Sequence, residues 1–140
     1  MRGLLRTAWL PVFVLLLGCG SKSDLVPVSG RVMMDNQPLA KANVQFSPMD
    51  QANKTVSSAT TDEDGYFKLS ASLPNGNTAE GAVVGKYTVR ISLFDHTSEE
   101  GKPAHGQQVP AKYNSKSELT FDVPAGGTKE ANFNLTKKKK

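Results

Sequence analysis

An acidic turn is the first place where the chain could do chemistry. Three consecutive carboxylates stand before a glycine: Asp62, Glu63, Asp64 and Gly65. Such a run is typical of a calcium loop, so we tested the EF-hand register. Placing Gly65 at the sixth position puts Thr60 at the first ligand and Ala71 at the twelfth, and neither side chain supplies a carboxylate. We therefore expect a hairpin turn, with no metal.

Two histidines are the second place where the chain could do chemistry. His96 and His105 share one long polar segment, with Asp95 and Ser98 nearby. Metal binding would need a third ligand and catalysis would need a positioned nucleophile, and no residue at suitable spacing supplies either. We expect solvated loop histidines, no cofactor and no enzymatic activity.

The single cysteine stands at the end of an apolar stretch near the N-terminus. Arg2 and Arg6 precede that stretch, and the window from Arg6 to Lys22 holds 15 residues without charge. About 20 apolar residues are needed for a membrane-spanning helix, and Pro11 also weakens a long helix. The pattern indicates a signal peptide over residues 1-18 and not a permanent span.

The residues Leu16, Leu17, Gly18 and Cys19 resemble the lipobox of bacterial lipoproteins. The resemblance implies cleavage between Gly18 and Cys19 and lipidation of Cys19, which would hold the exported protein to the membrane of the cell envelope. Several acyl chains make such an anchor stable. Gly20 stands where an inner-membrane retention signal usually has Asp, which favours the outer membrane.

The charge is unevenly spread. The formal net charge is +4, from 17 basic and 13 acidic residues. Six basic residues lie in the signal or in the tail 137-140, so 11 remain against the 13 acidic ones. A mildly acidic body argues against nucleic acid as a partner. The tail is expected to be a solvated end, with attraction to anionic lipid or polymer as the alternative.

The segments that must position these residues have the sequence pattern of β-strands. Short alternating runs separated by turn residues predict one all-β domain over 28-136, a seven-stranded antiparallel β-sandwich that follows a linker at 19-27. The expected strands are 28-34, 42-48, 56-61, 66-70, 86-94, 118-123 and 131-136. The third alternates poorly and is a candidate edge strand. The connections 71-85 and 95-117 are long, and long loops are common binding sites.

Three segments resemble signatures of the carboxypeptidase regulatory-like, or transthyretin-like (prealbumin-like), domain. They are Val28 to Pro48, Thr61 to Phe67 and Gly85 to Ile91. Asn36 departs from the usual turn glycine. These signatures lie in turns and strands, so the resemblance implies a fold and carries no chemistry.

We therefore expect a membrane-anchored envelope lipoprotein whose sandwich is a non-catalytic interaction or structural module, with an unidentified envelope protein or polymer as partner. The alternative is a cell-surface carbohydrate- or ligand-binding module. If seven strands alternate in direction, the first and the seventh run the same way, and the chain leaves the sandwich at the end opposite to where it enters. The entry end is tethered to the membrane, so a partner site is expected at the other end, the tip. That tip would carry Asp62, Glu63, Asp64, His96 and His105, while the loops 49-55, 71-85 and 124-130 face the lipid.

Overall fold

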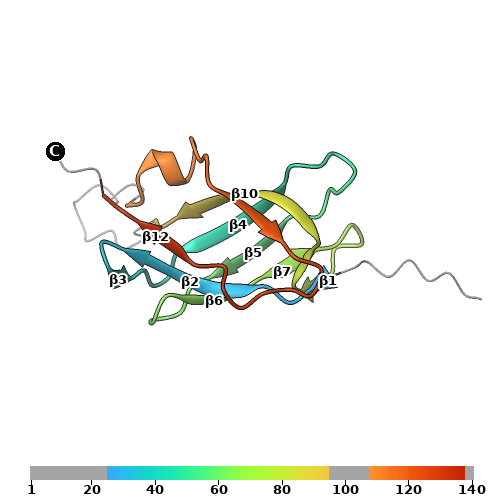
Figure 1. The fold of residues 1–140 in the computed structure, drawn as a ribbon, viewed down its shortest axis with the longest axis horizontal. Coiled ribbons are helices and arrows are strands. Elements are labelled where there is room, and N and C mark those ends of the chain that lie inside the picture. The colour runs from blue at the N-terminus through green and yellow to red at the C-terminus, as the bar shows by residue number, and fades with distance from the viewer. Residues whose placement is uncertain (1–24, 95–107, 138–140) are drawn as a thin grey trace, which may run out of the picture.

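The computed structural model describes residues 25-94 and 108-137 (Figure 1). The expected signal peptide, the lipidation site Cys19 and the loop residues His96 and His105 lie outside these ranges. Within them, no helix is long and apolar enough to cross a membrane. The described chain is all-β, and its one helical element is the short 3-10 helix η1 (Ala111–Tyr113).

The larger of two layers is a six-stranded antiparallel sheet, and β4 and β5 lie at its middle. In spatial order its strands are β11 (Thr120–Val123), β10 (Gly85–Ser92), β4 (Asn43–Pro48), β5 (Ser57–Thr60), β7 (Ser70–Ser72) and β8 (Thr78–Glu80). The expected alternation is confirmed in β4, where Val44 and Phe46 are buried and Asn43 is exposed, and Ala42 directly before the strand is also buried.

The smaller layer forms around β2 (Ser29–Met34). Its partners are β12 (Phe133–Leu135) on one side, and β3 (Gln37–Pro38) and β6 (Tyr66–Lys68) on the other. The first and last strands of this layer run parallel, with Phe133 opposite Val32. A separate pair joins β1 (Leu25–Val26) to β9 (Ala82–Val83). The chain therefore enters and leaves the sandwich at opposite ends (Figure 1).

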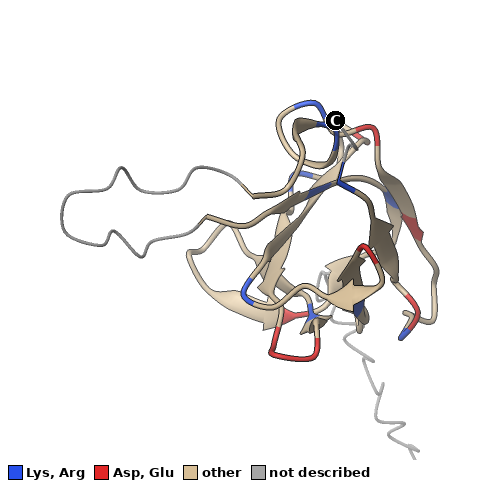
Figure 2. Cartoon of the chain, turned by 90° about the vertical axis from the view of Figure 1, so that its left-hand side faces the viewer, with Lys and Arg blue, Asp and Glu red and all other residues tan. Residues whose placement is uncertain are grey.

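The core fills the space between the two layers, which Figure 2 shows from the end where the C-terminus lies. Phe46 is fully buried at its centre, and its ring lies 5.7 to 6.5 Å from the rings of four other aromatic residues. These are Phe67, Tyr87, Phe121 and Phe133. Burial of these large apolar rings stabilises the fold, and their mutual contacts add to that stabilisation.

Gly30 makes a close approach in the small layer possible. A Cβ atom at this position would lie 2.0 Å from the carbonyl oxygen of Ala131. The backbone that leads into β12 can therefore cross β2 only where β2 has no side chain.

The expectation that 71-85 is a loop is wrong. Ser70–Ser72 and Thr78–Glu80 form the hairpin β7-β8, whose turn is closed by a hydrogen bond of 2.8 Å from the Leu73 N–H to the Asn77 carbonyl. Gly76 takes a positive φ of 81° in that turn. An Asn-Gly pair at 75-76 is a strong hairpin signal, although the strands beside it are short and polar.

The expectation that the third strand lies at a sheet edge is also wrong. β5 lies inside the large sheet between β4 and β7, because the unexpected hairpin supplies its second partner. The described residues form twelve strands. Seven of them fall in the expected segments, and the five others are β1, β3, β7, β8 and β9.

Candidate functional site

The acidic turn has a structural role in the connection between β5 in the large sheet and β6 in the small layer. The Asp62 carboxylate accepts hydrogen bonds of 2.9 Å from the N–H groups of both Asp64 and Tyr66. Glu63 forms an ion pair of 3.8 Å with Lys41, and both side chains are largely exposed. An exposed pair of this kind contributes little to stability. Among the described residues, no group of three His, Cys, Asp or Glu side chains could hold a metal ion.

This turn shares one end of the sandwich with the 35-41 turn and the exit of the chain. The Lys41 N–H donates to the Thr61 carbonyl at 3.0 Å, which joins the 35-41 and 62-65 turns. The Lys137 N–H donates to the Asp35 carboxylate at 3.2 Å, so the tail leaves beside the same end. The structure thus brings Asp62, Glu63 and Asp64 together with the exit of the chain.

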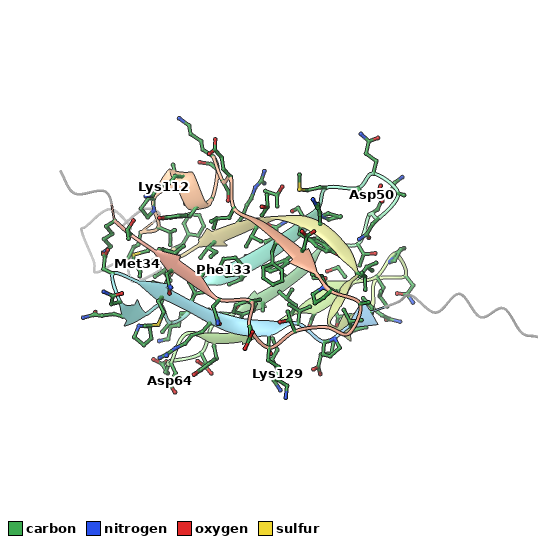
Figure 3. The ribbon with its side chains drawn as sticks, in the orientation of Figure 1. Met34, Asp50, Asp64, Lys112, Lys129 and Phe133 are labelled. Carbon is green, nitrogen blue, oxygen red and sulfur yellow. The ribbon has the colours of Figure 1, made fainter. Side chains whose placement is uncertain are left out.

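A second candidate lies on the outward face of the small sheet. Tyr66 and Lys68 are exposed on either side of the buried Phe67, which fixes the direction of both side chains. Their Cα partners on β2 are Arg31 and Ser29. We call this surface, together with Lys129, the basic face. Figure 3 shows Lys129 and Asp64 on the same side of the molecule, opposite Lys112 and Asp50.

Several contacts order one end of the basic face. The Arg31 guanidinium carbon lies 4.9 Å above the centre of the Tyr66 ring, and its Nε donates to the Asp64 carbonyl at 2.8 Å. The Arg31 N–H donates to the Asn132 side chain at 3.0 Å. Cation–π contact and a fixed guanidinium limit the freedom of the Tyr66 ring, which is still 52% exposed.

Two adjoining hollows run along the basic face, with volumes of about 580 and 320 Å³. Both are lined by Ser29, Lys68 and Lys129. Asp62 and Tyr66 line only the larger hollow, and Glu80 lines only the smaller one. We call the two hollows together the groove.

The lysines of the groove carry unneutralised charge. Among the residues that the structure describes, the only ion pair joins Lys41 to Glu63. Lys68 and Lys129 are exposed and have no carboxylate within ion-pair distance in those ranges. Their ammonium groups are therefore free to meet an external anion. The sequence analysis did not select these residues, although the alternation around Phe67 places Lys68 on the outside.

The environment of η1 is built from contacts within the fold. The Tyr113 hydroxyl lies 3.3 Å from the Thr136 hydroxyl and accepts from the Thr136 N–H at 3.1 Å. Burial acts to raise the pKa of Tyr113, but the Thr136 hydrogen bonds and the nearby Lys112 ammonium outweigh it and lower the pKa. Asn114 donates to the Val109 carbonyl at 2.8 Å. These side chains stabilise the segment that precedes β11.

Comparisons of the chain with protein-family models, with curated proteins and with solved structures find no match. Any functional assignment therefore depends on the residues and geometry of the chain itself.

Proposed function

We propose that the chain is an exported lipoprotein, anchored to the cell envelope through Cys19, whose transthyretin-like sandwich is a non-catalytic interaction module. The observation that carries the anchor is the sequence Leu16 to Cys19 directly before a folded domain. The domain begins at Leu25, so the six residues from Cys19 span about 20 Å when fully extended. One end of the sandwich is then held close to the bilayer.

The two-layer all-β architecture supports the transthyretin-like assignment. The first signature, Val28 to Pro48, spans the β2-β3 hairpin of the small layer and β4 of the large sheet. Its turn residues Asp35 and Asn36 take positive φ values of 49° and 65°, which Asn and Asp accept more readily than most residues. Asn36 can therefore take the place of a turn glycine.

A non-catalytic role is supported by the polar side chains whose hydrogen bonds are made within the fold. Asp62 closes a turn, and the Thr61 hydroxyl bridges the Ala42 N–H and the Leu39 carbonyl at 2.9 and 2.6 Å. The Tyr87 hydroxyl donates to the Val83 carbonyl at 2.7 Å. These groups stabilise strand connections within the fold.

The anchor is tested by labelling the full chain with a fatty-acid analogue in a Gram-negative host. The wild-type protein should carry the label and stay with the outer membrane fraction after a high-salt wash. Cys19→Ser should lose the label and leave the membrane fraction, while its thermal denaturation in detergent stays unchanged because Cys19 precedes the domain. Unlabelled wild-type protein, or a variant that stays in washed membranes, would contradict the proposal.

A carbohydrate- or ligand-binding module is the second candidate function. The groove favours it, because a concave surface with a partly exposed ring and a few polar groups is typical of ligand sites. The two candidates are compatible, since an anchored module can act by binding a ligand.

A further inference from the structure

Lys68 and Lys129 lie in the middle of the groove, since both side chains line the larger and the smaller hollow. Ser29 lies between them: Lys68 is its Cα partner on β6, and Lys129 lies in the segment on its other side. That segment is fixed by two hydrogen bonds, from the Ser29 N–H to the Thr128 carbonyl at 2.9 Å and from the Ala131 N–H to the Ser29 carbonyl at 3.1 Å. Two ammonium groups beside one hydroxyl-bearing strand favour a single acid group at this point.

The two ends of the groove carry the opposite charge. Asp62 lines the end of the larger hollow and Glu80 lines the end of the smaller one. A carboxylate accepts hydrogen bonds and repels a second anion. A matching ligand therefore has an acid group at its middle and hydrogen-bond donors, such as hydroxyl groups, on both sides. A chain with an acid on every unit fits this pattern poorly.

The backbone beside the groove gives little room for an added peptide strand. On the free side of β6, the Tyr66 carbonyl accepts from the Asp62 N–H at 2.8 Å, and the Tyr66 N–H donates to the Asp62 carboxylate at 2.9 Å. Lys68 is the only other residue of β6 whose backbone groups face this side, because Phe67 faces β2, and the carbonyl of the next residue, Leu69, accepts from the Gly81 N–H at 2.7 Å. Because strand addition needs a row of free backbone groups, recognition here depends on side chains.

The Tyr66 ring offers an apolar surface to such a ligand. Arg31 stacks on the ring but does not line the groove, whereas Tyr66 does. A sugar ring presents aliphatic C–H groups on its faces, and these can contact an exposed aromatic ring while its hydroxyl groups meet the polar ends.

We infer that the groove binds an acidic polysaccharide in which carboxylated and neutral sugars alternate. Lys68 and Lys129 bind the carboxylate, Asp62 and Glu80 accept from hydroxyl groups, and Tyr66 contacts a sugar ring. This inference deepens the proposed function, because it names the ligand class of the interaction module.

The test is calorimetric titration of the full chain in detergent with a hyaluronate tetrasaccharide, in which the two kinds of sugar alternate. An exposed ionic contact contributes up to about fivefold in affinity, and reversing one charge replaces attraction by repulsion. Lys68→Glu and Lys129→Glu should each weaken binding at least about tenfold. Lys54→Glu is the matched control, because this exposed lysine lies in the 49-55 loop outside the groove and should leave affinity within twofold.

Three further measurements separate the alternatives. Raising the salt from 0.05 to 0.5 M should weaken wild-type binding, since exposed charges are screened. A neutral chitin tetrasaccharide and a tetraglutamate peptide should each bind at least about tenfold more weakly than hyaluronate. Equal binding of the neutral sugar, stronger binding of the peptide, an equal effect of Lys54→Glu, or no binding of hyaluronate would overturn the inference.

The labelling of Cys19 is a separate readout. Labelled protein that does not bind hyaluronate would leave the lipoprotein proposal standing and remove the ligand. Binding by unlabelled protein would leave the ligand standing and remove the anchor.

Discussion

Three phenylalanines with different burial allow the core to be tested by one chemical change. Phe46 is fully buried, Phe121 is half-buried on the edge strand β11, and Phe94 is 55% exposed. Phe121 packs against the core but is only partly covered, because β11 has a neighbour on one side only. Replacement by alanine should therefore have three clearly separated costs.

The costs follow from burial and ring contacts. Phe46→Ala removes a full ring and four aromatic contacts, so it should lower the free energy of unfolding by about 5 kcal/mol. Phe121→Ala removes a half-covered ring and its contacts with Phe46 and Phe133, and should lower it by about 2 kcal/mol. Phe94→Ala should stay within about 0.5 kcal/mol of the wild-type protein.

Urea denaturation followed by circular dichroism measures these differences. With an m value of about 1.5 kcal/mol per M, the midpoints should fall by about 3 M for Phe46→Ala, about 1.3 M for Phe121→Ala and less than about 0.4 M for Phe94→Ala. If Phe46→Ala does not fold, Phe46→Leu should fold with a loss of about 1 to 2 kcal/mol. Equal midpoints for the Phe46 and Phe121 variants would refute the assigned burial.

Three further substitutions test other features. The buried Ser57 hydroxyl has no hydrogen-bond partner among the described residues, so Ser57→Ala should raise the melting temperature by about 4 °C in calorimetry. Burial raises the pKa of Tyr87 above its usual 10.0, so stability should be full below pH 10 and fall above it; Tyr87→Phe should abolish that alkaline loss in denaturation at several pH values. Gly30→Ala should cost more than about 2 kcal/mol by urea denaturation, because its methyl group would meet the Ala131 carbonyl.

The fold was predictable where a strand alternates between apolar and polar residues. Val44 and Phe46 in β4, and Tyr87, Val89 and Ile91 in β10, point inward as expected. The hairpin β7-β8 was not predictable in this way, since its strands are three residues each and contain small or polar side chains. Pairing with β5 stabilises these strands, and that contact is not visible in a local pattern.

The candidate groove could not be predicted for a related reason. Lys68 and Lys129 come from segments far apart in the sequence, and only the register of β6 and of the 128-131 segment against Ser29 brings them to one surface. The acidic turn was visible because its residues are consecutive. Its main role, however, is to close the turn between β5 and β6 through the Asp62 carboxylate.

The parallel pairing of β2 with β12 determines when folding can finish. Arg31 and Asn132, which are joined by a hydrogen bond, are separated by 101 positions in the sequence. Contacts between such distant positions form slowly, because a long loop must close first. During synthesis β2 therefore emerges about a hundred residues before its parallel partner, and the apolar side chains of Val32 and Met34 stay without their final cover. A chain that ends at Val123 would lack that partner permanently and should expose this edge to aggregation.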